Sequence, residues 1–258
     1  MININNLLEG RWWAIWYRNL LVWRKFALPS LMAGFAEPLF YLLGLGYGLG
    51  NFINFINEIP YIIFLASGII CANAMQVATF EGLYSCYTRM EPQQTWQGML
   101  AAPFDVQDIV IGETCWIATK SFISFIAVLL VVIALNLMVN WKVLWILPII
   151  LLTGFTFGAL ALIITAFARS YDFFLYYVTL FITPMTLLSG VFFPIDALPV
   201  MMQTGVYFFP LIHVIELVRP LIMGQTPTHI LVHLAVLSLY AIIAIHIAIF
   251  LLKKRLMA

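Results

Sequence analysis

Few side chains in this sequence stand in arrangements that could do chemistry. His229 and His233 are four residues apart, the spacing of two metal ligands on one face of a helix. The nearest further candidates are His213 and Glu216, because no cysteine or carboxylate accompanies the pair locally. Two histidines alone are a weak indication, and we therefore expect no metal site in this chain.

Catalytic motifs are also missing. The sequence contains neither a G-x-x-x-x-G-K-[ST] nucleotide loop nor an H-E-x-x-H zinc motif. A nucleophile and a base must lie at matching depths, whereas Ser189 falls near the outer end of one apolar stretch and His246 toward the inner end of another. The three cysteines form no C-x-x-C pair and are expected to be free thiols. The chain itself is not expected to be an enzyme or to hold a cofactor.

The stretch 36–50, AEPLFYLLGLGYGLG, combines a carboxylate, Glu37, with Pro38 and four glycines on alternate positions. A dinucleotide loop needs a preceding strand and a water-exposed turn, and neither is indicated here. Small residues four apart instead allow helix backbones to approach closely, which predicts a helix that packs on two sides. Facing lipid, Glu37 would cost about 3 kcal/mol, so we expect it to face protein or a pathway, as a structural hydrogen-bonding group or as a contact to cargo.

The composition places these residues in a membrane protein. Of 258 residues, 64% are hydrophobic and only 9% are charged, whereas soluble domains carry roughly 25% charged residues. A net charge of +1 argues against a nucleic-acid partner. Since about 20 apolar residues span a bilayer, six stretches qualify: 26–49, 59–80, 121–141, 143–168, 173–195 and 230–252.

The distribution of basic residues sets the expected topology. With six spans, ten lysines and arginines fall on one side, and only Lys142 and Arg219 fall on the other. This asymmetry predicts that both termini are cytoplasmic. The apolar stretch 197–215 is interrupted by prolines and a glycine and is predicted to be a re-entrant helical hairpin. The expected fold is an all-α polytopic membrane protein with six transmembrane helices, forming one domain over residues 1–258.

Two cytoplasmic segments are expected to have structure of their own. Residues 10–26 combine tryptophans on one helical face with basic residues on the other, which is typical of an interfacial helix and fits a simple anchor equally well. In the segment 83–116, a short helix begins near Pro92 and a longer helix follows, capped by Asp105. The short helix carries an apolar stripe that either folds back onto the bilayer or docks a cytosolic protein; the stripe consists of Trp96, Met99 and Leu100.

The outer segment 194–224 ends in a polar cluster. Glu216 and Arg219 are three residues apart and are predicted to form an ion pair on a helix, one turn after His213. The cluster either anchors the re-entrant helix or guides a polar headgroup.

Nearly the whole chain resembles the permease of the nodulation-type lipo-oligosaccharide exporters, a branch of the type-2 ABC exporters. The resemblance rests on six segments: WYRNLLVWRK (16–25), EPLFYLLGLGYGLG (37–50), ATFEGLYS (78–85), TWQGMLAAP (95–103), SYDFFLYYVTLFITPMTLLSGVFFPIDALP (170–199) and PLIHVIELVRPLIMG (210–224). It implies a bacterial inner-membrane homodimer bound to two copies of a separate ABC ATPase, which would hold ATP and Mg²⁺. The cargo implied is an amphipathic molecule, whether lipo-oligosaccharide, glycolipid or drug-like lipid.

By position, the resemblance also implies roles for particular residues. Residues 10–26 would be a connecting helix, and the segment after span two would be the helix seated in the ATPase. The substrate path would follow spans one, two and five, with the outer segment at its exit. The candidates are Glu91, Trp96, Met99 and Leu100 for ATPase coupling, Glu37, Tyr41, Phe80 and Phe181 for the substrate path, and Phe193, His213, Glu216 and Arg219 for the outer gate.

Two other functions remain open at the level of sequence. A free-standing secondary transporter could use Glu37 for ion coupling, although one deep carboxylate without a basic partner gives thin support. A membrane scaffold without transport activity is the second alternative.

Overall fold

The structure, a computed structural model, describes residues 10–56, 59–135, 137 and 140–257. Within these residues the chain is almost wholly helical, and β1 (Phe55–Ile56) and β2 (Ile59–Pro60) form one short antiparallel hairpin. The sequence-based prediction of an all-α membrane protein is confirmed.

Five helices of the described chain are long and apolar enough to cross a membrane. The first is α3 (Ala27–Tyr41), extended by η1 (Leu42–Tyr47) and η2 (Leu49–Asn51). The second is α4 (Tyr61–Phe80), extended by η3 (Glu81–Ser85) and α5 (Cys86–Met90). The others are α7 (Val106–Ala134), α8 (Ile146–Phe167) with the preceding η4 (Trp141–Trp145), and α13 (Ile230–Leu256).

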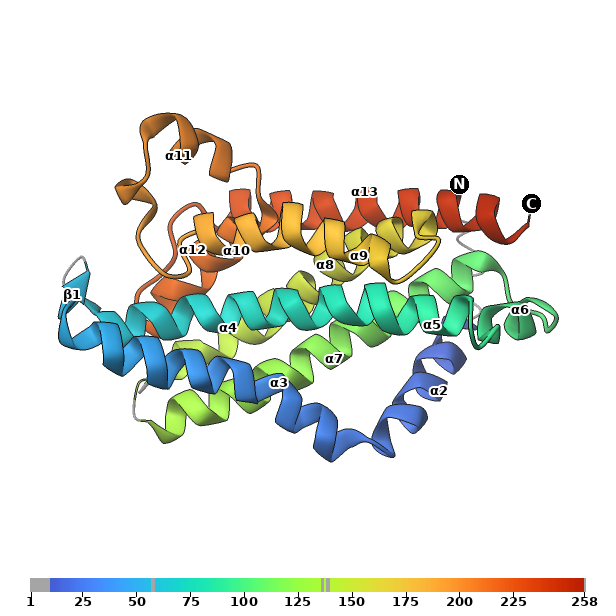
Figure 1. The fold of residues 1–258 in the computed structure, drawn as a ribbon, viewed down its shortest axis with the longest axis horizontal. Helices are drawn as coiled ribbons and strands as arrows, with labels where there is room; N and C mark the ends of the chain where they lie inside the picture. Colours follow the sequence, from blue (N-terminus) through green and yellow to red (C-terminus); the bar gives the residue numbers. More distant parts are fainter. Residues whose placement is uncertain (1–9, 57–58, 136, 138–139, 258) are drawn as a thin grey trace.

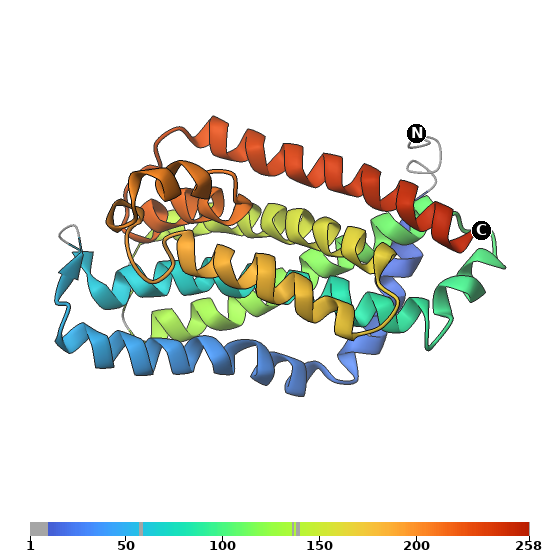
Figure 2. The same cartoon turned by 45° about the horizontal axis from the view of Figure 1, so that its top comes forward.

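The long helices form an elongated bundle (Figures 1 and 2). Helices α4, α7 and α8 occupy its centre, whereas α3 and α13 lie along opposite sides. Small residues bring the central helices together: a Cβ added to Gly154 of α8 would lie 2.6 Å from the Cα of Ala118 in α7. At one end of the bundle lie α2 (Trp12–Arg24), α6 (Thr95–Leu100) and the last turn of α13; the β hairpin and α11 (Val200–Val206) lie at the other.

Three of the expected spans have different bounds. The second helix, expected at 59–80, continues through η3 and α5 to Met90. The third span, expected at 121–141, belongs to a helix that begins at Val106 after the predicted Asp105 cap, which forms a capping box with Asp108, and that ends at Ala134 rather than at 141. The fifth is expected at 173–195, but its helical part, α9 (Asp172–Tyr177), η5 (Val178–Ile182) and α10 (Thr183–Leu188), stops at Leu188. A turn follows, in which Gly190 has a φ of +85°, a backbone conformation that favours glycine.

After this turn and η6 (Ile195–Ala197), the two half-helices predicted for the outer segment are present. Helix α11 and helix α12 (Pro210–Ile222) are bent by 90° relative to each other. Pro210 is the first residue of α12. A backbone N–H at this position has no hydrogen-bond partner within the helix, so the helix loses nothing by the proline's missing N–H. Helix α11 is largely exposed, whereas most of α12 is buried against α4, α8 and α13.

The glycines of the first span divide between two sides. A Cβ on Gly46 would lie 3.1 Å from Ile62 of α4, and one on Gly50 would lie 3.9 Å from Tyr61. Around Gly44 and Gly48 no atom lies within 4 Å of such a Cβ. One side of this helix therefore packs inside the chain, and the other is left open for a neighbour.

Among the described glycines, the tightest approach lies between Gly68 of α4 and the turn after α10. A Cβ on Gly68 would lie 2.4 Å from the carbonyl oxygen of Val191, and backbone cannot move aside cheaply. We expect Gly68→Ala to destabilise the protein by about 1–3 kcal/mol. The thermal midpoint of the purified variant measures this, with Gly205→Ala as the matched control, because a Cβ on Gly205 meets no atom within 4 Å. An unchanged midpoint in Gly68→Ala would contradict the close packing of the turn on α4.

Candidate functional site

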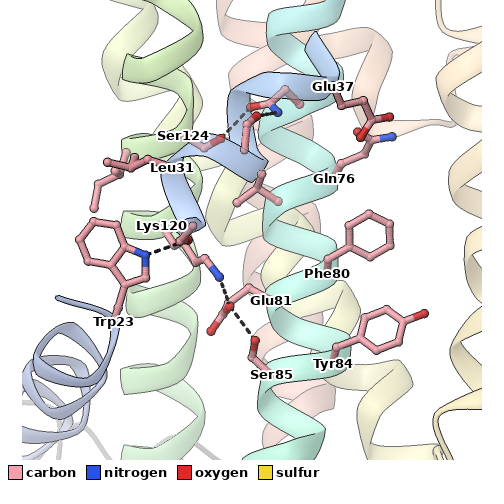
Figure 3. Close-up of a pocket in the computed structure, with 15 residues that line it drawn as sticks. Trp23, Leu31, Glu37, Gln76, Phe80, Glu81, Tyr84, Ser85, Lys120 and Ser124 are labelled. Carbon is pink, nitrogen blue, oxygen red and sulfur yellow. Dashed lines mark hydrogen bonds and ion pairs between the residues drawn. The ribbon is translucent and has the colours of Figure 1, made fainter. Parts of the chain in front are cut away.

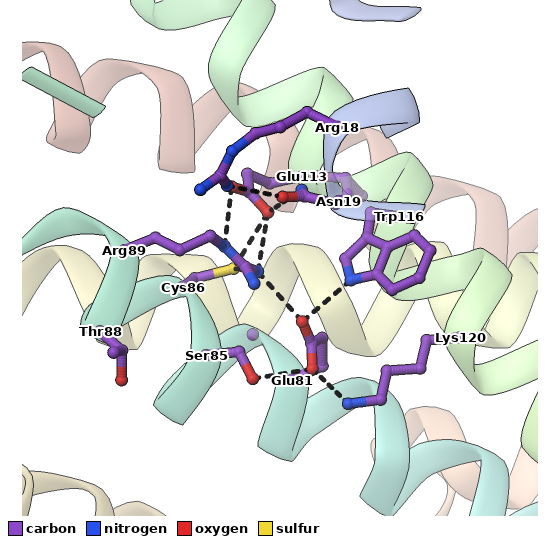
Figure 4. A network of polar contacts seen from close by, with 12 residues as sticks. Arg18, Asn19, Glu81, Ser85, Cys86, Thr88, Arg89, Glu113, Trp116 and Lys120 are labelled. Carbon is purple, nitrogen blue, oxygen red and sulfur yellow. Dashed lines mark hydrogen bonds and ion pairs between the residues drawn. The ribbon is translucent and has the colours of Figure 1, made fainter. Parts of the chain in front are cut away.

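A buried network of charged residues joins four helical segments near one end of the bundle (Figure 4). Its two carboxylates are Glu81, at the start of the π-helical segment η3, and Glu113 of α7. Both side chains are almost fully buried. π-Helical segments inside longer helices are frequent at functional sites, and this one turns Glu81 inward toward α7.

Glu113 holds the network together. Its Oε1 accepts hydrogen bonds from Arg89 Nε (3.0 Å) and from Trp96 Nε1 of α6 (3.0 Å). Its Oε2 accepts from Arg89 Nη2 (2.8 Å) and from Asn19 Nδ2 of α2 (2.9 Å). One carboxylate therefore connects α2, α5, α6 and α7.

Glu81 forms the second half of the network. Lys120 Nζ lies 2.6 Å from its Oε2, and Ser85 Oγ donates to the same oxygen at 2.8 Å. Trp116 Nε1 donates to Oε1 at 3.0 Å, and Arg89 Nη2 lies 3.1 Å from it. Arg89 thus bridges both carboxylates, which links the two halves.

This arrangement joins helices and leaves neither carboxylate available for acid–base chemistry. Glu81 accepts four hydrogen bonds and Glu113 accepts five, counting a longer one from Cys86 Sγ (3.7 Å), so neither carboxylate is free to act as a base. Arg18 of α2 lies beside the cluster; burial lowers its pKa, and the charge of Glu113 acts in the opposite direction. Buried, charge-assisted hydrogen bonds are the strong ones, and a shift of α6 must therefore move α7 or break them.

The short helix α6 presents two different faces. Trp96, expected from sequence to pack on a partner, is instead fully buried in the chain itself, so this part of the expectation is corrected. Met99 and Leu100 are half-buried against the core, whereas Gln97 and Gly98 are exposed. The exposed surface of α6 is therefore the face opposite Trp96, continued by the exposed stretch 91–94.

Glu91 also has a partner within the chain. Its Oε1 lies 2.7 Å from Nη2 of Arg255 in the last turn of α13, and the pair is partly exposed. On the other side of α6, Arg11 Nη1 donates to the carbonyl of Pro103 at 2.8 Å. Both ends of the chain's helical part are thus attached to the segment that carries α6.

A pocket of about 330 Å³ lies between α3, α4 and α7, directly beside Glu81 (Figure 3). Two of the substrate-path candidates, Glu37 and Phe80, line it together. The other two lie elsewhere: Tyr41 packs against Phe192 at 5.9 Å between ring centroids, and Phe181 stacks on Tyr177 at 5.7 Å. The side chains of Tyr41 and Phe181 are both exposed.

Arg219, one of the outer-gate candidates, makes different contacts from those expected. Arg219 donates to Ser67 Oγ (2.8 Å) and to the carbonyl of Gly190 (2.6 Å), and it lies 3.7 Å from the ring centroid of Phe64. Its predicted ion pair with Glu216 is not found among the described residues. The guanidinium instead satisfies a buried backbone carbonyl on a neighbouring segment, which joins α12, α4 and the turn after α10.

The histidines pair across two helices. Nδ1 of His213 lies 2.8 Å from Nδ1 of His233, and Nε2 of His213 lies 3.0 Å from the carbonyl of Tyr207. His229 has no hydrogen bond to this pair among the described contacts; it stands just before α13 with a left-handed φ of 50°. Within the described parts of the chain, no three metal-binding side chains cluster. Phe193, the remaining gate candidate, is half-buried in the turn before η6.

Comparison with known proteins matches residues 8–223 to the family described as ABC-2 type transporter. The chain belongs to the ABC-2 type transporter family. It is 42% identical over 246 residues to nodulation protein J of Rhizobium leguminosarum bv. trifolii, covering 95% of this chain and 94% of that protein. It is 39% identical over 248 residues to nodulation protein J of Sinorhizobium fredii, covering 96% and 94%. It is 31% identical over 237 residues to nodulation protein J of Azorhizobium caulinodans, covering 92% and 93%.

As an ABC-2 permease, the chain is a multi-pass integral membrane protein and a transport subunit that is not itself catalytic. Membership of this family implies an ABC ATPase as partner. The resemblance identified from the sequence segments is therefore confirmed.

Sequence reasoning missed the charged network of this permease. Arg89 and Glu113 lie in the segment 83–116 that the sequence predicts to be cytoplasmic, and Glu81 and Lys120 flank it, but all four side chains are buried or partly buried. One signal was present: Glu81 directly follows a long apolar run, and Trp116 and Lys120 stand one turn apart on the next long helix. That signal does not say which charges meet.

Proposed function

We propose that this permease is the membrane subunit of an ATP-driven exporter that moves an amphipathic substrate across the bacterial inner membrane. The substrate is a lipo-oligosaccharide, a glycolipid or a drug-like lipid. The transporter consists of two copies of this subunit and two copies of a separate ABC ATPase, which binds ATP and Mg²⁺. The names of the relatives support export in nodulation, and the family supports the ATPase.

The observation that carries this proposal is the continuous path from α6 to the pocket. Trp96 on the inner face of α6 contacts Glu113, Glu113 binds Arg89, and Arg89 contacts Glu81 in the pocket wall. Movement of the ATPase against the exposed face of α6 is passed along these buried contacts to α4 and α7. The helices around the pocket then change their spacing, and the substrate is released outward along the dimer interface.

The open side of the first span supports the dimer. Gly44 and Gly48 have room for a neighbouring backbone, whereas Gly46 faces α4 of the same chain. Small residues spaced in this way favour close helix pairs in membranes. The second copy would pack here, with both termini of each subunit on the cytoplasmic side.

The rival function is secondary transport coupled through Glu37, which lines the pocket and is exposed. The two functions differ in their energy source. Vesicles that contain the permease with an ATPase encoded next to it test both, by measuring uptake of a fluorescent lipo-oligosaccharide into inside-out vesicles. ATP-dependent uptake, absent with the permease alone, supports the exporter. Gradient-driven uptake by the permease alone that is lost in Glu37→Gln overturns it, and a complex without any transport would support a scaffold instead.

A further inference from the structure

The pocket beside Glu81 continues into a second cavity. This cavity has a volume of about 310 Å³ and shares five lining residues with the first: Trp23, Ser30, Glu81, Ser85 and Lys120. Together they form a space that runs along α4 from Glu37 to the level of Arg18 in α2. The charged side chains of Glu81, Arg89 and Lys120 lie in the walls of these two cavities. Their hydrogen bonds run to other side chains of the network.

Lys120, the cation that lines the pocket between α3, α4 and α7, is already engaged, as is Arg89 of the second cavity; Arg18 lines the second cavity but not this pocket. Lys120 contacts Glu81, and Arg89 contacts both Glu81 and Glu113. A bound phosphate would have to displace one of these buried carboxylates and would also stand near the negative charge of Glu37. The charges therefore disfavour an anionic headgroup as occupant.

The polar groups at the other end of the pocket have free capacity. For Glu37 and Gln76, no side-chain hydrogen bond is found within the described part of the chain, and Figure 3 shows both side chains at the same end of the pocket. Asn73, by contrast, donates to the carbonyl of Gly34 (2.8 Å) and accepts from Ser124 (3.0 Å), so it holds α3, α4 and α7 in place. A carboxylate and an amide can together accept from and donate to neighbouring hydroxyl groups.

The remaining walls are apolar and partly aromatic. Phe80 and Tyr84 stand one turn apart with ring centroids 5.9 Å apart, and both are exposed at the pocket. Leu31, Val77 and Ile123 add aliphatic surface. Flat rings beside a few directed polar groups suit the C–H faces of a sugar ring, and the aliphatic wall suits an acyl chain.

From this combination we infer that the pocket between α3, α4 and α7 binds the uncharged, hydroxyl-rich headgroup of an amphiphile. Glu37 and Gln76 hydrogen-bond to the hydroxyl groups, and Phe80 and Tyr84 pack against the rings. The inference rests on the proposed function and deepens it, because it places a substrate-binding site inside each subunit rather than only between the two.

Photolabelling of the complete complex, permease with its ATPase in phosphatidylcholine nanodiscs, tests this site. The probe is dodecyl maltoside that carries a diazirine, and labelled peptides are identified by mass spectrometry. We expect labels on α3 and α4 around the pocket, lowered at least about fivefold by Gln76→Leu or Glu37→Gln, as loss of one good hydrogen bond predicts. Gln225→Leu, an exposed amide in the outer turn before α13, is the matched control and should label like the wild type.

Competition between unlabelled detergents and the probe separates recognition of the headgroup from general affinity for detergent. It uses the wild-type protein, so it remains informative if a variant fails to fold. Unlabelled dodecyl maltoside should suppress labelling of the wild type at concentrations at least about fivefold below those needed for dodecyl phosphocholine or dodecyl phosphate. Equal competition by all three, or labels only outside the pocket, would overturn the inference. ATP-dependent transport is measured with the same purified complex in sealed vesicles, so active transport with failed labelling would overturn the pocket assignment alone.

Discussion

Replacing Glu113 by glutamine is expected to destabilise the protein by about 3–5 kcal/mol, the usual effect of removing one partner from a buried ion pair. The amide keeps the size of the carboxylate but leaves Arg89 with only Glu81 as counter-charge. It also weakens the acceptor that Trp96 and Asn19 share. The thermal midpoint of the purified chain should fall by roughly 6 °C or more.

The matched control is Glu91→Gln. Glu91 also pairs with an arginine, Arg255, but its side chain is 43% exposed. Exposed pairs contribute about 0–1 kcal/mol, so this midpoint should hardly change. Similar midpoints for Glu113→Gln and the wild type, at one scan rate, would show that the network does not hold these helices together.

Replacing Gly98 by tyrosine is expected to detach the ATPase while leaving the permease folded. Gly98 lies on the exposed face of α6, and no atom lies within 4 Å of a Cβ placed there. The chain can therefore accept the side chain, whereas a partner packed on this face cannot. Overpacking costs about 1–3 kcal/mol, and we expect the ATPase recovered with the tagged permease to fall about tenfold or more.

Gly205→Tyr provides the control for this substitution. Gly205 is also exposed on a short helix with open space around it, but it lies in α11 at the opposite end of the bundle. Normal recovery of the ATPase with both variants would place the docking surface elsewhere.

Trp96→Ala affects the same coupling from inside the chain. Truncation of a fully buried tryptophan typically costs about 3–5 kcal/mol, and here it also removes the donor to Glu113. We expect weaker ATPase attachment or hydrolysis without export, with membrane insertion intact. Because Trp96 does not reach the surface, these effects would come from a displaced α6.

The features that sequence predicted well depend on local properties of the chain. Apolar length gave the membrane helices, and Asp105 marked the start of a helix through its own cap. The prolines and glycine in 197–215 predicted the break between α11 and α12, because each weakens helical hydrogen bonding at its own position.

The features that sequence missed depend on contacts between distant segments. The spacing of Trp96, Met99 and Leu100 correctly indicated an apolar stripe, but it could not say that Trp96 meets Glu113 rather than another protein. Likewise, Arg89 reaches a carboxylate 24 positions away on another helix. Local hydropathy does not show that Arg89 and Glu113 pair, because it carries no information on contacts between distant segments.

The most direct test of the account is ATP-dependent transport by purified components. Inside-out vesicles containing the permease and its ATPase should accumulate fluorescent lipo-oligosaccharide when ATP and Mg²⁺ are added. Vesicles with Gly98→Tyr permease should not, and those with Gly205→Tyr permease should behave like the wild type. Uptake that needs no ATPase, or that continues unchanged in Gly98→Tyr, would contradict the proposal that an ATPase drives this permease through α6.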